Sequence, residues 1–312
     1  MSRRRSPLVP GLIALLAGLS LASLVIGPAP ISIPAALKAL ASDQGAASIV
    51  VREIRLPRTL LALLIGWIFG LSGAGLQGLL RNPLADTAVF GAPQAAAFGA
   101  VLVIYSGIIG TLSWALPFAA IAGALLSIAL VVAVAGTSLT ISLSPNPFAV
   151  TEIVFWLLGS FEDRSMVHVG LSMPFILLAS FLILKASSGL RALALGEETA
   201  RSLGTDVARL RGLIVAGAAI GTGASVAVAG SIGFVGLVAP HLVRPFVGYD
   251  PARTLVPAGL AGAGLLLAAD CTVRLIPSGA EVKVGVLTAL IGVPFFLWVI
   301  ARRKAELVEA PA

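Results

Sequence analysis

Long apolar runs, bounded by charged residues, prolines or glycines, recur from one end of the sequence to the other. A run of about 20 apolar residues can cross a hydrocarbon core about 30 Å thick as an α-helix. The pattern therefore predicts an all-α, polytopic membrane helical bundle of about nine to ten transmembrane helices. Nine spans can be read directly, at residues 8–27, 58–80, 87–107, 115–136, 169–186, 212–230, 232–247, 253–273 and 282–301.

Glycines at four-residue spacing lie within these runs, as in the pairs Gly66/Gly70 and Gly217/Gly221. Small residues at this spacing let helix backbones approach closely in lipid. The spans are therefore expected to pack as one compact bundle, and residues 1–312 to form a single transmembrane domain.

Basic residues predict the orientation of the spans. The triplets 3-RRR-5 and 302-RRK-304 flank the first and last spans, and basic residues favour the cytoplasmic side, so both termini are expected in the cytoplasm. Counted from the two ends, the spans then lack one crossing, which residues 137–168 must supply. This segment is atypical, because 145-PNP-147 and Glu152 interrupt it, and irregular backbone at membrane depth must be buried in protein or line water.

Composition supports a membrane protein. Only 11% of the residues are charged and the mean hydropathy is +1.04, whereas soluble domains are about a quarter charged. The net charge of +7 reflects basic residues at the ends of the runs, so topology explains it better than nucleic-acid binding does. The single cysteine, Cys271, excludes an intrachain disulfide. A cleaved signal peptide is the alternative reading of the first run, but that run is long and no convincing A-x-A site follows it.

No catalytic or metal-binding constellation is apparent. No lysine follows a glycine, so the phosphate-binding loop GxxxxGK[ST] is absent and the chain is not expected to be an ATPase. His168 and His241 have no companion at metal-ligand spacing, so no metal site is expected. Asp270 lies inside an apolar run, four residues before Arg274. A local ion pair on one helix face is favoured over a proton relay.

The polar segment 191–212 differs from the other connections. Within it, EETARSL is amphipathic and compatible with a helix, and Gly196 and Gly204 flank it. A solvated connector is one reading, and a short cytoplasmic helix that docks on a partner is the other. Glu197 and Arg201 have the spacing of a helix-surface ion pair. The candidate docking residues are Leu195, Gly196, Glu197, Glu198, Thr199, Ala200, Arg201, Ser202, Leu203 and Gly204.

Five extended segments, in order along nearly the whole chain, resemble the signature segments of the FecCD-type permeases. They are RLPRTLLALLIG, SGAGLQGLLRNPLAD, LGEETARSLG, GSIGFVGLVAPHLVR and VGVLTALIGVPFFLW. These permeases are the membrane subunits of ABC importers for iron-siderophores, heme and cobalamin. The resemblance implies a type II importer permease of ten spans in the bacterial inner membrane. It also implies that LGEETARSLG is the coupling helix that sits in an ATPase groove.

The resemblance implies several partners and no cofactor bound by this chain. The expected assembly contains a second copy of the chain, two cytoplasmic ATPase subunits that hold ATP and Mg²⁺, and a periplasmic binding protein. In this family, arginines of the RLPR motif and of the outer end of the ninth span meet glutamates of the binding protein. The matching residues are Arg55, Arg58 and Arg274. The alternative is that these side chains snorkel to the membrane interface.

The chain departs from the family pattern at residues 137–168, where it is shorter by about one helix. The stretch SPNPFAVTEIVFWLLGSFEDRS within this region looks most like members that handle heme or another iron chelate, and cobalamin is the alternative. Two other classes stay open, a secondary transporter or channel and an inactive scaffold. Sparse intramembrane charge argues against a secondary transporter. The shortened segment 137–168 leaves an inactive scaffold as an open alternative.

Overall fold

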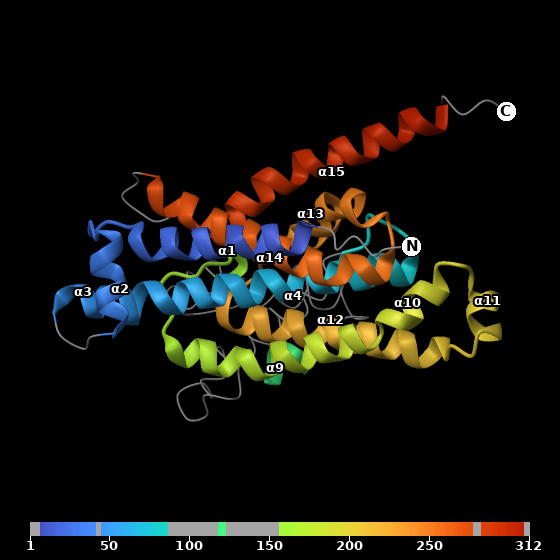
Figure 1. Cartoon of the computed structure of the whole chain (residues 1–312), viewed down its shortest axis with the longest axis horizontal. Coiled ribbons are helices and arrows are strands. Elements are labelled where there is room, and N and C mark those ends of the chain that lie inside the picture. The colour runs from blue at the N-terminus through green and yellow to red at the C-terminus, as the bar shows by residue number, and fades with distance from the viewer. Residues whose placement is uncertain (1–6, 42–44, 87–117, 123–155, 277–281, 309–312) are drawn as a thin grey trace, which may run out of the picture.

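The structure, a computed structural model, describes residues 7–41, 45–86, 118–122, 156–276 and 282–308, and these contain helices and no strand. Figure 1 shows the long helices running along one axis of the molecule. In chain order the elements are α1 (Leu8–Val25), α2 (Ile33–Ala41), α3 (Ala46–Ile49), the π-helix η1 (Val50–Arg55), α4 (Leu56–Leu80), α9 (Met166–Lys185), α10 (Ser187–Leu193), α11 (Glu197–Ser202), α12 (Val207–Ala229), α13 (Val235–Val243), the 3-10 helix η5 (Arg244–Val247), α14 (Pro251–Leu275) and α15 (Val284–Val308).

The all-α membrane bundle predicted from the apolar runs is confirmed. Within the described residues, six helical segments are long and apolar enough to cross a membrane: Leu8–Val25, Ala46–Leu80, Met166–Lys185, Val207–Ala229, Pro251–Leu275 and Val284–Arg302. The predicted span 232–247 is divided into the short helices α13 and η5. The predicted span 87–107, most of 115–136 and residues 137–155 lie outside the described part of the chain.

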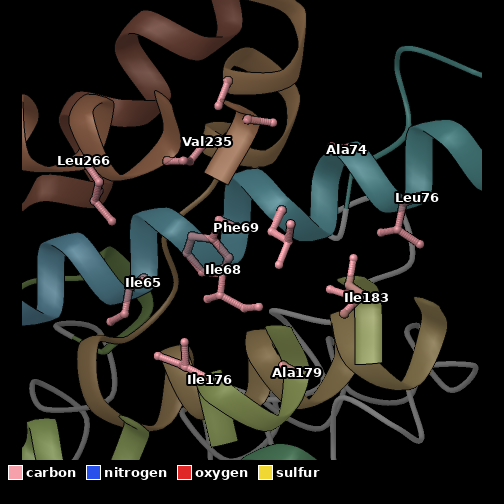
Figure 2. Packing of buried hydrophobic residues seen from close by; sticks show 14 of the residues in the cluster. Ile65, Ile68, Phe69, Ala74, Leu76, Ile176, Ala179, Ile183, Val235 and Leu266 are labelled. Atoms are coloured by element: carbon pink, nitrogen blue, oxygen red, sulfur yellow. The ribbon is translucent and has the colours of Figure 1, made fainter. Parts of the chain in front are cut away.

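Helix α4 forms the centre of the bundle and is packed on several sides. Figure 2 shows Ile68 and Phe69 of α4 among the buried hydrophobic side chains of the neighbouring helices. Ile176 and Ile183 reach this cluster from α9, and Leu266 reaches it from α14. Because lipid is as apolar as these side chains, close packing rather than burial from water holds such helices together.

Glycines bring α4 and α14 into backbone contact. A Cβ atom at Gly66 would lie 2.4 Å from the carbonyl oxygen of Gly262, and one at Gly70 would lie 2.0 Å from that of Ala258. No side chain fits at either position, so only glycine permits this crossing. The prediction that the Gly66/Gly70 pair supports close helix packing is therefore confirmed.

The segment 28–57, which connects the first two predicted spans, is largely helical. It forms α2, α3 and η1, and η1 continues directly into α4. Ala36 and Ala39 of α2 are buried against Leu24 and Val51. The amphipathic sequence IPAALKALA is too short to span a membrane, which is why a search for long apolar runs passes over it.

The two ends of the bundle carry different elements (Figure 1). Helix α1 begins and α15 ends at the end that carries α10 and α11, whereas α2 and α3 lie at the opposite end. Helix α9 begins at the α2–α3 end, so Glu162 and Asp163, which precede it, belong to that end. The start of α1 and the end of α15 thus lie at the same end of the bundle as the candidate coupling segment. Which side faces the cytoplasm stays a prediction.

Candidate functional site

The candidate coupling segment forms a short helix between two glycine turns. Helix α11 (Glu197–Ser202) is flanked by Gly196, with φ of 111°, and Gly204, with φ of 80°. Both values lie in the left-handed region, where a Cβ atom is strained. The two glycines therefore let the chain leave α10, form one turn and a half of helix, and turn back into α12. The predicted short helix is confirmed.

Two ion pairs converge on one carboxylate of this helix. Oε1 of Glu197 lies 2.6 Å from Nη2 of Arg201, and Oε2 lies 2.8 Å from Nη2 of Arg211 on α12. The predicted Glu197–Arg201 pair is confirmed, and the second arginine ties α11 to α12. Both acidic residues of the segment, Glu197 and Glu198, lie in the first helical turn, where negative charge is favourable.

The outer surface of the segment also exposes apolar side chains. Leu195 is 66% exposed and Leu203 is 63% exposed, whereas Ala200 is fully buried. Ala200 thus packs α11 against the bundle, and Leu195 and Leu203 lie exposed on either side of this helix. A rigid helix with charges on its face and leucines at its edges is suited to a protein partner.

At the opposite end of the bundle, Asp270 of α14 meets two arginines. Nε of Arg58 lies 2.7 Å from Oδ1 of Asp270, and Nη2 of Arg274 lies 2.9 Å from Oδ2. The side chains of Arg58 and Arg274 are 7% and 6% exposed, and that of Asp270 is fully buried. The predicted Asp270–Arg274 ion pair is confirmed, and Arg58 joins it from α4.

The arginines at this end also cap the carboxyl end of α1. Arg55 donates hydrogen bonds to the carbonyl oxygens of Leu24 and Val25, at 2.8 and 2.7 Å, and also to that of Ala29. Arg274 donates to the carbonyls of Ser23 and Ile26 and to the Ser23 hydroxyl. These carbonyls have no partner within the helix, and the helix dipole makes cations favourable there.

The candidate docking residues Arg55, Arg58 and Arg274 do not present their side chains at the surface of the single chain. All three side chains are buried, and their guanidinium groups are engaged by Asp270 and by backbone carbonyls. The physical reason is that three helix ends converge here, so each guanidinium finds an acceptor inside the protein. Snorkelling to the interface is disfavoured on the same grounds. Docking of a binding protein by these residues is untested and stays a prediction.

The two histidines form local contacts. His168 lies in the first turn of α9, where Nδ1 accepts a hydrogen bond from the backbone N–H of Ser165 at 3.1 Å. The ring of His241 makes an edge contact with Phe295, with centroids 5.5 Å apart. Within the described residues, no group of three or more His, Cys, Asp or Glu side chains could hold a metal ion.

Sequence reasoning missed a polar chain that enters the bundle near α11. Arg244 of η5 donates to Oε1 of Gln77, and Nε2 of Gln77 donates to the carbonyl oxygen of Gly236 at 3.1 Å. Gln77 is 2% exposed. A lone glutamine in the apolar run of α4 was the available signal, because a buried amide needs partners.

Comparison with known proteins places this geometry in a family. The model of the FecCD transport family matches residues 15–143 and 132–302. The chain belongs to this family. It is therefore a multi-pass membrane protein and an ABC importer permease, as the ordered motifs predicted. The two matches overlap at residues 132–143, which include the first part of the segment 137–168 that the sequence pattern predicted to be atypical.

Curated relatives and a solved structure agree with this assignment. The uncharacterized ABC transporter permease protein YvrB of Bacillus subtilis is 33% identical over 85% of this chain and 82% of its own length. The cobalamin import system permease protein BtuC of Halobacterium salinarum is 36% identical over 83% of this chain and 75% of its own. The vitamin B12 import system permease protein BtuC of Citrobacter koseri is 36% identical over 81% of this chain and 83% of its own length.

The solved structure is described as an inward-facing conformation of a metal-chelate type ABC transporter. It superposes with a TM-score of 0.81 at 32% identity, and the match covers 94% of this chain and 98% of that one. The similarity extends over the whole bundle and is not confined to one motif.

Proposed function

We propose that this chain is the membrane subunit through which a metal chelate is imported into the cell. Family membership supports an importer, and the similar solved transporter is described as metal-chelate type. Two relatives at 36% identity are named for cobalamin or vitamin B12, so cobalamin stands ahead of the iron-siderophore or heme that the sequence motif favoured.

The exposed helix α11 is the observation that carries the mechanism. The sequence has no phosphate-binding loop, so a separate ATPase subunit must supply energy. A segment that transmits motion from such a partner must be both exposed and stiff. Two ion pairs hold α11 to itself and to α12, while Leu195 and Leu203 remain at the surface. We infer that α11 docks on the ATPase.

Charge reversal on α11 tests this docking. The chain is co-expressed with its candidate ATPase and binding-protein partners, and uptake and ATP hydrolysis are measured in the same vesicles. Glu198→Lys and Arg201→Glu are expected to reduce uptake at least tenfold while hydrolysis continues. Arg253→Glu, at an exposed site on α14, is the matched control and should leave uptake near wild type. Wild-type coupled uptake in both α11 variants would overturn the assignment.

The ligand is tested with the loaded binding protein. Vesicles that contain the assembled importer receive binding protein saturated with cyanocobalamin, a ferric siderophore or heme, and ATP-dependent accumulation is measured for each. We expect cobalamin to accumulate. Accumulation of an iron chelate alone would restore the choice that the sequence motif favoured, and accumulation of none would support the inactive scaffold.

The same proposal includes a second copy of the chain and a periplasmic binding protein. Exposed apolar side chains on α15, including Leu290 at 66% and Leu297 at 60%, fit either lipid or a second copy. The binding protein is expected at the end that carries Arg55, Arg58 and Arg274. Because these groups are buried in the single chain, glutamates of the binding protein would have to compete with Asp270 and with the α1 carbonyls.

Association kinetics test this docking. Arg55→Glu, Arg58→Glu and Arg274→Glu should each slow association of the loaded binding protein, and added salt should slow the wild type. Arg52→Glu, outside the RLPR motif, should have a smaller effect. Unchanged association rates in three correctly inserted variants would leave the arginines with a purely structural role.

A further inference from the structure

A cavity of about 670 Å³ opens between α4, α13, η5 and α15 at the end of the bundle that carries α11. Its volume lies within the range of about 300–1,000 Å³ that is usual for small-molecule sites. Three arginines line it, Arg81, Arg244 and Arg302, and so does His241. No aspartate or glutamate is among the described lining residues. The described lining therefore contributes three positive charges and no negative charge.

One arginine is held in place by a buried scaffold. Arg244 donates to the side chain of Gln77, which is 2% exposed and is itself fixed by its bond to the Gly236 carbonyl. The nearby carboxylate of Asp250 is engaged elsewhere, because it caps α14 and pairs with Arg191 and Arg253. The protein thus positions a guanidinium at the cavity while directing the neighbouring negative charge away from it.

An aromatic face of α15 forms the opposite wall. Phe295, Trp298, Val299 and Arg302 all line the cavity, and their spacing puts them on one helix face. The Phe295 and Trp298 rings lie 5.9 Å apart, and the Arg302 guanidinium lies 5.6 Å from the Trp298 ring. This wall is therefore apolar at Phe295 and Trp298 and positively charged at Arg302.

The surroundings of the cavity mark the level of a membrane interface. Tyr249 is 71% exposed, Phe246 is 65% exposed and Trp298 is 52% exposed. Exposed tyrosine and tryptophan gather where the hydrocarbon core meets the headgroups. Arginines at this level, beside the aromatic side chains of α15, suit a molecule with an anionic head and an apolar tail.

We propose that this cavity binds the phosphate headgroup of an anionic phospholipid. Arg81, Arg244 and Arg302 would surround the phosphate, and the α15 face would contact the start of an acyl chain. Free phosphate shares the charge but not the apolar contact. Binding of a phospholipid there would require neither the transported ligand nor the docking of α11.

The tryptophan in the cavity supplies a direct reporter. Replacement of Trp67, Trp114 and Trp156 by Phe leaves Trp298 as the single tryptophan of the full-length chain. This variant is placed in phosphatidylcholine nanodiscs that contain a small, fixed fraction of brominated phosphatidylglycerol or of brominated phosphatidylcholine. We expect the brominated phosphatidylglycerol to quench Trp298 more strongly. A companion variant that keeps only Trp67, whose indole donates to Ser180 within the bundle, should show no such preference.

Neutralising the arginines then assigns the preference. Arg81→Gln, Arg244→Gln and Arg302→Gln should each lower the preference for phosphatidylglycerol about fivefold. Arg244→Lys keeps the charge and should retain most of it, which separates charge from folding. Arg209→Gln, an exposed change on α12 outside the cavity, should leave the preference unchanged.

Three outcomes would overturn the proposal. Equal quenching by the two brominated lipids would show that no anionic lipid is selected. An equal loss in Arg209→Gln would reduce the effect to general surface charge. Loss of the preference on adding inorganic phosphate, but not on adding chloride at the same ionic strength, would assign the cavity to a free anion.

Discussion

The bundle carries a cluster of arginine–carboxylate pairs at each end, and water reaches only one of them. At the α11 end, the side chains of Glu197, Arg201 and Arg211 are between 31% and 64% exposed. At the other end, Asp270 and its two arginines are at most 7% exposed. The distances are alike, 2.6 and 2.8 Å at the α11 end and 2.7 and 2.9 Å at the other end.

The difference in exposure gives the same chemistry two different uses. An exposed pair contributes little to stability, because water and salt screen it, so its charges remain available to a partner. A buried pair becomes costly when one member is removed, because the other charge is left without compensation. The first cluster is therefore suited to recognition, and the second fastens α1, α4 and α14 together.

The assignment of the two clusters to opposite sides of the membrane has an all-or-none test. In a Cys271→Ser background, Ser202→Cys and Asp163→Cys each supply one thiol, on α11 and before α9. A membrane-impermeant maleimide should label position 202 only from the cytoplasmic side and position 163 only from the periplasmic side. Labelling of both positions from the same side would show that the two clusters do not lie on opposite sides of the membrane.

The largest stability effect is expected at Asp270. Asp270→Asn removes the charge that compensates Arg58 and Arg274 and should destabilise the protein by about 3–5 kcal/mol. Thermal unfolding in detergent micelles, compared with wild type, measures this. Glu197→Gln, the matching change in the exposed cluster, is the control. Equal losses in the two variants would contradict the contrast drawn from exposure.

A smaller effect is expected at Arg55, which caps α1 through hydrogen bonds to backbone carbonyls. Arg55→Met should cost about 2 kcal/mol, because hydrogen bonds from a charged donor to the α1 carbonyls are lost. Arg55→Lys keeps the charge but loses the planar arrangement of donors, so its stability should lie between those of the wild type and Arg55→Met. Hydrogen exchange of the last turn of α1 localises the change. Protection equal to wild type in Arg55→Met would show that the cap contributes nothing.

The smallest stability effect is expected on α11 itself. Arg201→Gln removes an i, i+4 pair on an exposed surface, for which about 0.3–0.5 kcal/mol is typical. Thermal unfolding should barely change, and added salt should remove what difference exists. A loss as large as that expected for Asp270→Asn would mean that α11 is a structural element rather than a docking surface.

Sequence reasoning succeeded where the information is local. Span positions follow from the length of apolar runs, and the Glu197–Arg201 and Asp270–Arg274 pairs follow from helical spacing. It failed for Arg58 and Arg55, whose acceptors come from α14 and α1, because which helix ends converge is decided by tertiary packing. Gln77 and Arg244 were missed for the same reason, since their bond joins residues far apart in the chain.

The glycine crossing of α4 and α14 has a mechanical consequence. Sliding between packed helices relies on side chains that can change rotamer while the backbones stay apart. At Gly66 and Gly70 the two backbones touch directly, so no such layer exists there. These two helices therefore move as one rigid body. Any change between outward-facing and inward-facing states has to come from movement of other helices relative to α4 and α14. Helix α15, which has many exposed side chains, is the first candidate for such movement.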